Sequence, residues 1–155
     1  MTLDQQRRLL PNGARAVALV SAVAALAVSV YLTVEHYSRS IGFACPESAT
    51  INCVKVTTSK YSVIAGVPVA LLGLLFFVGM TVLLALPVRN RFRDLAVLAG
   101  SGVGVLMVLW LVYVELFEVD AICLWCTGVH VLTIIMFGAV LWSFLPSLDD
   151  DRPVR

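Results

Sequence analysis

The sequence contains 155 residues, of which 60% are hydrophobic and 14% are charged, with a formal net charge of +1. Soluble domains are roughly 45 to 50% apolar, so this composition excludes an ordinary soluble domain and indicates an integral membrane protein. Because the charge is nearly balanced and no basic cluster stands out, nucleic acid is not an expected partner.

The first apolar run follows a polar N-terminal segment, residues 1–15. It covers the uncharged residues 16–34, close to the ~20 residues that cross a bilayer core. The run is too long for the apolar part of a signal peptide and lacks a convincing cleavage site. We therefore expect a retained transmembrane helix at about 16–36.

A polar segment comes next and predicts a loop outside the membrane at residues 37–66. This loop holds two of the four cysteines, Cys45 and Cys53. Val54, Val56 and Tyr61 predict a short helix that lies against the membrane surface within it.

The rest of the chain predicts three further spans, at about 67–87, 95–115 and 122–145. Proline is tolerated in a first helical turn, so Pro68 favours a helix start next to it. Residues 115–120 predict a brief acidic turn between the last two spans.

Gly100 and Gly104 form a G-x-x-x-G pattern inside the third predicted span. Small residues at this spacing let helices approach closely in a membrane, so we interpret the pattern as a packing feature.

The predicted fold is an all-α integral membrane protein, a bundle of four transmembrane helices formed by residues 16–148. Four spans place both termini on one side, and eight of the eleven basic residues fall there: Arg7, Arg8, Arg15, Arg89, Arg91, Arg93, Arg152 and Arg155. The positive-inside rule makes that side cytoplasmic, including the tails 1–15 and 149–155. All four cysteines then face the opposite, oxidising compartment.

Cys123 and Cys126 form a C-x-x-C motif at the start of the last span. Cysteines three apart on a regular helix are about 5 to 6 Å apart at Cβ, whereas a disulfide needs ~3.8 Å, so the pair fits best astride a helix start. The positive end of the helix dipole there favours a thiolate, the species that attacks disulfides. A passive disulfide and half of a zinc site remain alternatives.

The second pair, Cys45 and Cys53, closes a small ring that would contribute roughly 2.5 kcal/mol as a structural disulfide. Two pairs on one face of the membrane favour a relay, in which an exposed pair meets a soluble partner and a membrane-seated pair meets a lipid-soluble one. A scaffold braced by two disulfides is the non-enzymatic alternative. Counting alone leaves three connectivities open.

His130 lies four residues after Cys126, on the same helix face. An ionisable residue inside a span is a functional candidate, and this one is suited to polarise a quinone carbonyl, donate a proton or stabilise the Cys126 thiolate. A histidine bonded to a neighbouring helix is the alternative. His36, near an interface, is expected to be solvated.

The chain resembles a bacterial homologue of vitamin K epoxide reductase over nearly its whole length, from Ala16 to Leu145. The resemblance rests on C-x7-C at Cys45 and Cys53, on Ser59 after it, on the run GVPVALLG at residues 66–73, and on CLWC at residues 123–126.

This resemblance implies a role for each cysteine. Cys126 would reduce the quinone, Cys123 would be its partner, and Cys53 would pass electrons to Cys123. Cys45 would exchange with a thioredoxin-fold protein, which has to be a separate DsbA-like chain because no such domain is fused here.

The resemblance also implies a quinone pocket that includes Ser59, Tyr61, Phe76 and His130. Val69 and His130 stand where vertebrate enzymes carry an asparagine and a tyrosine. These departures favour quinone reduction over epoxide reduction.

We therefore expect an oxidoreductase of the bacterial cytoplasmic (inner) membrane that passes electrons from the secreted partner to menaquinone or ubiquinone in the lipid bilayer. No bound metal is expected. The rivals are a DsbB-type oxidase, which keeps its second cysteine pair in a loop, the scaffold, and a zinc site made by all four cysteines.

Overall fold

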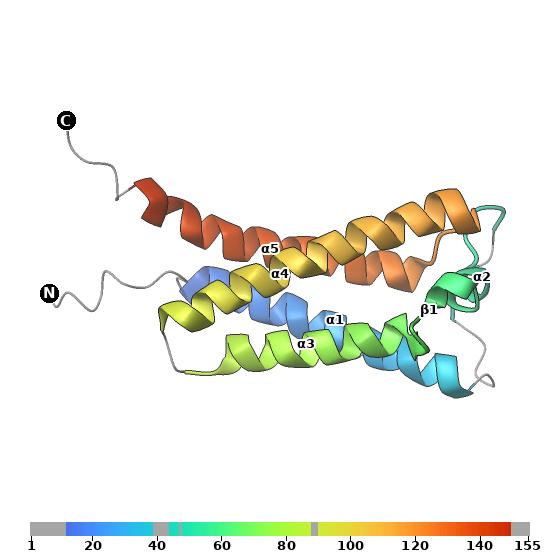
Figure 1. Cartoon of the computed structure of the whole chain (residues 1–155), viewed down its shortest axis with the longest axis horizontal. Coiled ribbons are helices and arrows are strands. Elements are labelled where there is room, and N and C mark those ends of the chain that lie inside the picture. The colour runs from blue at the N-terminus through green and yellow to red at the C-terminus, as the bar shows by residue number, and fades with distance from the viewer. Residues whose placement is uncertain (1–11, 39–43, 47, 88–89, 150–155) are drawn as a thin grey trace, which may run out of the picture.

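The computed structural model describes residues 12–38, 44–46, 48–87 and 90–149. Four helices run along the length of the molecule (Figure 1): α1 (Asn12–Ser38), α3 (Val69–Ala85), α4 (Arg91–Tyr113) and α5 (Leu124–Asp149). α1 packs against both α3 and α5, and α4 packs mainly against α5. The start of α1 and the end of α5 lie at the same end of this bundle.

Three stretches of these helices are long and apolar enough to cross a membrane: Gly13–Ser38, Arg91–Val119 and Leu124–Phe144. α3 is also apolar but has 17 residues, which span about 25 Å at ~1.5 Å per residue. Large apolar side chains are exposed on the outside of the bundle, among them Val103, Leu106 and Trp142. Such a surface is unfavourable in water and suits contact with lipid.

The core of the bundle combines small residues on α1 with larger side chains from its neighbours. Ala18, Ala22 and Ala25 are fully buried, and their spacing places them on one face of the helix. Around them pack Phe77, Met80, Leu84, Val97, Met136, Val140 and Phe144. The alanines allow the helix axes to approach closely, which increases van der Waals contact where no hydrophobic driving force operates between helices.

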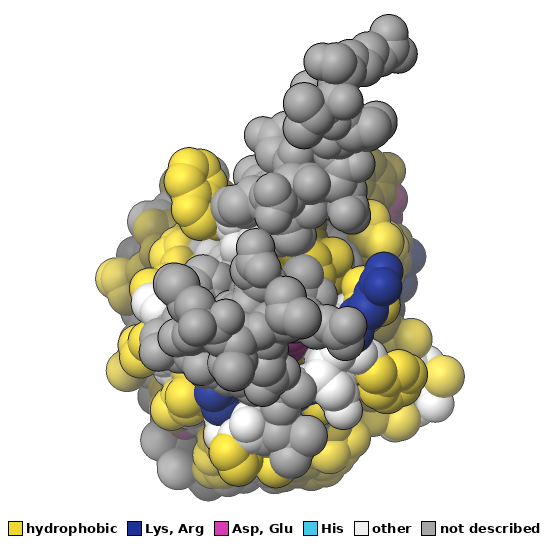
Figure 2. Space-filling view, turned by 90° about the vertical axis from the view of Figure 1, so that its left-hand side faces the viewer, with side chains coloured by type: hydrophobic (Ala, Val, Ile, Leu, Met, Phe, Trp, Pro, Cys, Tyr) yellow, Lys and Arg dark blue, Asp and Glu magenta, His cyan; other side chains and the backbone are white. Residues whose placement is uncertain are grey.

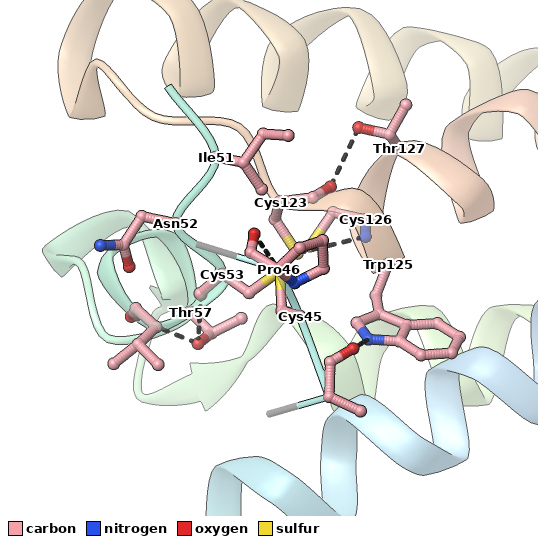
Figure 3. The surroundings of a disulfide bond; sticks show 12 residues. Cys45, Pro46, Ile51, Asn52, Cys53, Thr57, Cys123, Trp125, Cys126 and Thr127 are labelled. Atoms are coloured by element: carbon pink, nitrogen blue, oxygen red, sulfur yellow. Dashed lines mark hydrogen bonds between the residues drawn. A yellow bond between two sulfur atoms is a disulfide. The ribbon is translucent and has the colours of Figure 1, made fainter. Parts of the chain in front are cut away.

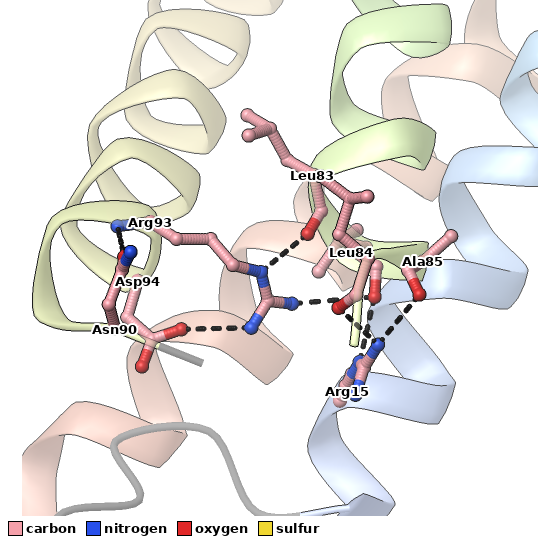
Figure 4. Close-up of polar contacts among 8 residues, drawn as sticks. Arg15, Leu83, Leu84, Ala85, Asn90, Arg93 and Asp94 are labelled. Atoms are coloured by element: carbon pink, nitrogen blue, oxygen red, sulfur yellow. Dashed lines mark hydrogen bonds and ion pairs between the residues drawn. The ribbon is translucent and has the colours of Figure 1, made fainter. Parts of the chain in front are cut away.

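Two arginines hold the C-terminal end of α3 (Figure 4). Arg15 of α1 donates to the carbonyl oxygens of Leu84, Ala85 and Leu86 at 2.7 to 3.0 Å. Arg93 of α4 donates to Leu83 at 2.6 Å and contacts Leu84 and the Asp94 carboxylate at 3.4 and 3.3 Å. These carbonyls have no partner within their own helix, so the arginines supply the missing donors. Viewed from this end, basic side chains lie among hydrophobic ones (Figure 2).

The opposite end of the bundle contains shorter elements. The five-residue helix α2 (Cys53–Thr57) and the 3-10 turn η1 (Lys60–Ser62) are followed by strands β1 (Val63–Ile64) and β2 (Val67–Pro68). The strands form an antiparallel hairpin with Ala65 and Gly66 at its turn, both with positive φ, as a type I′ turn requires. We expected the second span to begin near residue 67, but β2 occupies Val67 and Pro68, so the helix begins at Val69.

The predicted acidic turn at residues 115–120 is wrong. The helix continues from α4 as a π-helix, η2 (Val114–Val119). It ends at Asp120, whose left-handed φ of 51° is a conformation that aspartate tolerates better than most residues.

The other predicted spans differ from the observed helices at their ends. α1 continues to Ser38, beyond the expected limit of residue 36, and α4 begins at Arg91, before the expected residue 95. α4 begins early because the Asn90 side chain accepts a hydrogen bond from the backbone N–H of Arg93, which caps the helix start. The expected tails were 1–15 and 149–155, but residues 12–15 belong to α1 and Asp149 to α5. The rest of both tails, with Arg7, Arg8, Arg152 and Arg155, lies outside the described residues, as does Arg89.

Candidate functional site

The outer loop is joined to the segment before α5 by a short backbone bridge. The N–H of Asn52 donates to the Ile122 carbonyl at 3.1 Å, and the N–H of Ile122 donates to the Thr50 carbonyl at 2.9 Å. Ile51 and Ile122 thereby pair in parallel. Because Cys53 and Cys123 each follow this bridge in the chain, the two cysteine pairs are brought to one place (Figure 3).

Cys45 and Cys53 are joined by a disulfide, with their Cα atoms 6.3 Å apart. Asn52 accepts a hydrogen bond from the N–H of Lys55 at 2.8 Å, which makes it the cap of α2 and places Cys53 in the first turn. Cys53 is buried, whereas Cys45 is partly exposed. Of this pair, Cys45 is therefore the more accessible to a large partner.

Cys123 and Cys126 are both free thiols. As the C-x-x-C spacing predicts, a helix starts between them, at Leu124. The N–H of Cys126 donates to the sulfur of Cys123 at 3.2 Å, so this sulfur takes the place of a side-chain helix cap. The carbonyl of Cys123 accepts from the N–H and the hydroxyl of Thr127 at 2.8 and 2.9 Å.

These contacts favour the thiolate form of Cys123. A hydrogen bond from the Cys126 thiol lowers the pKa of Cys123, and the backbone amides of Cys126 and Trp125 add to this. Complete burial and the nearby Glu115 carboxylate oppose the shift without reversing it. Cys123 is thus the thiol of this pair that is better prepared for exchange.

A cavity of about 340 Å³ opens beside Cys126 between the four long helices. Of the predicted site residues, it is lined by Cys126, His130, Ser59, Tyr61 and Phe76. Cys123, Cys45 and Cys53 do not line it. Within the C-x-x-C motif, Cys126 is therefore the cysteine that faces the cavity.

The walls of the cavity suit a small, mainly apolar molecule that carries a few polar atoms. They are mainly apolar, with a few polar groups such as the Ser59 hydroxyl and the His130 imidazole, and the volume lies within the usual range for small-molecule sites. Val69 also lines the cavity. His36, which we expected to be solvated, is half-buried and lines it as well.

The tryptophan inside the C-x-x-C motif fastens the segment that carries Cys45. The indole N–H of Trp125 donates to the Ala44 carbonyl at 3.1 Å. The ring also packs against Tyr31, with 5.0 Å between the centroids, and the Tyr31 hydroxyl accepts a hydrogen bond from the Ala44 N–H at 3.3 Å. Sequence reasoning gave Trp125 no role, although its place between the two cysteines was a signal.

Glu115 is a second residue that the sequence analysis missed. It is 6% exposed, lines the cavity, and accepts a hydrogen bond at its carboxylate from the backbone N–H of Cys123. The available signal was an acidic residue directly after a long uncharged stretch, but we interpreted it as part of a solvated turn.

A protein-family profile described as the vitamin K epoxide reductase family matches residues 16–141. A comparison with curated proteins found no match. Because the profile covers most of the chain, including all four cysteines and the cavity, the chain belongs to the vitamin K epoxide reductase family, whose members are membrane thiol-disulfide oxidoreductases that use quinone-type electron carriers.

Proposed function

We propose that this protein accepts electrons from a secreted, thioredoxin-fold DsbA-like protein and delivers them to a membrane quinone, menaquinone or ubiquinone. It would thereby sustain disulfide formation outside the cytoplasm. The observation that carries the proposal is the division of labour within the C-x-x-C motif. Cys126 faces the cavity, whereas Cys123 follows the bridge that leads to Cys53.

The four cysteines would act in chain order from the outside inward. A thiolate of the reduced partner attacks the Cys45–Cys53 disulfide at Cys45, and resolution of the mixed disulfide leaves Cys45 and Cys53 reduced. Cys53 then attacks the Cys123–Cys126 disulfide at Cys123, and Cys45 resolves the new mixed disulfide by reforming its bond to Cys53. Each exchange moves two electrons, and the second leaves Cys123 and Cys126 as the reduced pair.

The cavity residues would hold the quinone, which supplies a two-electron acceptor when bound. The hydroxyl groups of Ser59 and Tyr61 and the imidazole of His130 are suited to bind ring oxygens, and Phe76 provides an aromatic wall. With Val69 and His130 at the two positions where the vertebrate pattern differs, quinone reduction is the activity that we propose.

In the membrane, we propose that α3 serves as the fourth span. Its length of about 25 Å approaches the ~30 Å hydrocarbon core, and the donors from Arg15 and Arg93 satisfy carbonyls at one of its ends. With four spans, the arginine-rich end lies in the cytoplasm of a bacterial inner membrane, and the four cysteines lie outside.

The test uses purified protein in detergent, a small dithiol as electron donor, and the absorbance of an added quinone. We expect steady quinone reduction by the wild type and none by Cys126→Ala. The matched variant Cys45→Ala keeps the C-x-x-C pair intact, so it retains activity with the small dithiol and loses it with a reduced DsbA-like protein.

Each rival predicts a different result. A braced scaffold predicts that quinone leaves the thiol state of the wild type unchanged. A four-cysteine zinc site predicts stoichiometric zinc and no reducible disulfide. A DsbB-type oxidase shares the quinone reaction, but its second pair lies in a loop, whereas Cys126 here lies in the first turn of α5.

A further inference from the structure

Glu115 is a buried acidic side chain for which the exchange of disulfides provides no role. Its side chain contacts both parts of the redox site, since it accepts the N–H of Cys123 and lines the same cavity as Cys126. Burial of a carboxylate is unfavourable, and one backbone N–H occupies only part of its capacity to accept hydrogen bonds. The position of Glu115 between the thiol pair and the cavity therefore needs an explanation.

The backbone around Glu115 is shaped to keep it there. Residues 114–119 form a π-helix, a rare form that occurs often at functional sites. The carbonyl of Glu115 accepts the N–H groups of both Asp120 and Ala121. Lys55 then fixes the left-handed Asp120 by donating to its carbonyl at 3.1 Å. This widened turn allows the chain to reverse within a few residues, so that Cys123 lies against the carboxylate.

Apolar packing supports the same arrangement. Val114, Val119 and Ala121 form a small buried cluster with Val56 and Tyr61. Tyr61 also donates its hydroxyl hydrogen to the carboxylate of Glu118, on the exposed side of the π-helix. The two glutamates of this helix thus differ, because Glu118 bonds a tyrosine at the surface and Glu115 faces the thiols.

A carboxylate and a thiolate placed so close together in a buried site repel each other. Whenever Cys123 becomes a thiolate, the proton that it loses is best kept on the neighbouring carboxylate. We propose that Glu115 is the proton acceptor of the Cys123–Cys126 pair: it binds one proton when the disulfide is reduced and releases it when the disulfide reforms. This inference rests on the redox role that the proposed function gives to the pair.

The reaction balances for electrons, protons and charge. Cys45 and Cys53 as thiols, the Cys123–Cys126 disulfide and the Glu115 carboxylate are the reactants. The two S–H bonds and the Cys123–Cys126 bond break, and the Cys45–Cys53 bond forms. The two protons end on the Cys126 sulfur and on Glu115, so Cys123 remains a thiolate and the net charge stays constant. Reduction of the Cys123–Cys126 pair thus places one proton on Glu115.

Other titratable groups surround Glu115, and each affects its local field. The cavity also contains His36 from α1, Tyr61 from η1, and His130 and Cys126 from α5. On its own segment, the exposed Glu118 and Asp120 follow it, and Lys55 of α2 lies against the backbone of Asp120. The test therefore compares variants that alter single groups.

The experiment measures the midpoint potential of the Cys123–Cys126 pair against pH, in buffers of oxidised and reduced small thiols without quinone. Thiols are trapped in the full chain, and mass spectrometry then gives the fraction of the Cys123–Cys126 pair that is oxidised. In the wild type we expect two protons to accompany the two electrons, one on Cys126 and one on Glu115. Glu115→Gln keeps an oxygen for the Cys123 N–H but takes up no proton, so the slope of potential against pH should halve.

Two further variants serve as controls. Glu115→Asp keeps a carboxyl group and should keep the wild-type slope. Asp120→Asn removes an equal charge from an exposed residue that can retain its left-handed conformation, and it should also keep the slope. A Glu115→Gln slope equal to that of the wild type would overturn the assignment.

This result is separable from the fate of the proposed function. If added quinone oxidises the pair but the slopes coincide, the role of Glu115 alone is wrong. If the wild type and Glu115→Gln differ in slope but quinone does not oxidise the pair, the proposed electron acceptor is wrong and the proposed role of Glu115 is supported. Should Glu115→Gln fail to fold, redox-difference infrared spectroscopy of the wild type replaces it. The carbonyl band of a protonated carboxyl group must disappear on oxidation, and an unchanged band would overturn the assignment.

Discussion

The two ends of the helix bundle are built in opposite ways. The arginine end is formed by Arg15, residues 83–86 and residues 90–94. There Arg15 and Arg93 donate to carbonyls at the end of α3, and the Asn90 side chain caps the start of α4. At the cysteine end, formed by residues 44–46, 48–68 and 114–126, the backbone is irregular and contains a π-helix, a hairpin and left-handed residues.

This difference indicates that the arginine end serves mainly the stability of the fold and the cysteine end mainly its chemistry. The arginine end adds hydrogen bonds to groups that are otherwise unsatisfied, so its contribution is to the free energy of unfolding. The cysteine end holds the Cys45–Cys53 disulfide and the free thiols of Cys123 and Cys126, and its irregular backbone places Cys126 against the cavity. Variants at one end should therefore affect activity, and variants at the other should affect stability.

The largest expected effect is the loss of activity in Cys123→Ser. A hydroxyl group is a far weaker nucleophile than a thiolate, so dithiol-driven quinone reduction should fall by at least roughly a thousandfold. The free energy of unfolding should change by only about 1 kcal/mol, because the hydroxyl still accepts the N–H of Cys126. Retained activity would show that Cys123 is not on the path of the electrons.

The converse variant is Arg93→Met, at the arginine end. It removes the guanidinium that contacts the Leu83 carbonyl and the buried Asp94. The free energy of unfolding should therefore fall by roughly 2 to 4 kcal/mol. Quinone reduction per folded molecule should stay within about twofold of the wild type. Denaturant titration in detergent measures the free energy of unfolding. Arg91→Met, at an exposed neighbour, is the control and should be nearly neutral.

A smaller effect should follow from Gly104→Ala. A Cβ at this position would lie 2.8 Å from Cζ of Phe76 and 3.2 Å from Thr133. The rigid ring would have to move toward the cavity, at a cost of about 1 kcal/mol, or roughly fivefold in KM for quinone. Gly100→Ala is the matched control, because its neighbour is the flexible Met80 side chain at 3.0 Å. Equal KM values for both variants would show that Phe76 does not contact the quinone.

These glycines also show how far sequence reasoning reaches. Their spacing predicted a packing feature, but not that side chains of α3 fill the spaces. Likewise, the C-x-x-C spacing predicted a helix start between the two cysteines, since that depends on distances within one turn, and α5 begins between them at Leu124. The count of spans predicted that Arg15 and Arg93 lie at one end of the bundle, and both bind the C-terminal end of α3 there. The side of the membrane that this end faces stays a prediction.

The features that were missed depend on contacts between distant segments. The segment that follows the π-helix is held by Lys55 and by the bridge between Ile51 and Ile122, neither of which leaves a local pattern. The role of Trp125 requires Ala44, 81 residues away in the chain. His36 lines the cavity together with residues of α3, α4 and α5, and the composition around a helix end does not predict such contacts.

The smallest expected effect is on the titration of Cys123. Because the Cys126 thiol and backbone amides stabilise its thiolate, the pKa of Cys123 is lowered from the ordinary thiol value, and its ultraviolet thiolate absorbance should appear at lower pH than that of free cysteine. The lowered pKa contributes stability that is fully present above the ordinary thiol pKa of ~8.5 and is lost as pH falls through the lowered value.

Cys126→Ala tests which contact produces this shift. It removes the largest contributor, the thiol hydrogen bond, but keeps the backbone N–H that donates to Cys123 at 3.2 Å. Because burial and the Glu115 carboxylate then outweigh the backbone amides, the titration should move upward in pH to at least the value of free cysteine. Cys123→Ser, as the blank, should lack the transition. A midpoint indifferent to Cys126→Ala would instead assign the shift to the start of α5, and the chemistry of the cysteine end would then depend on its backbone alone.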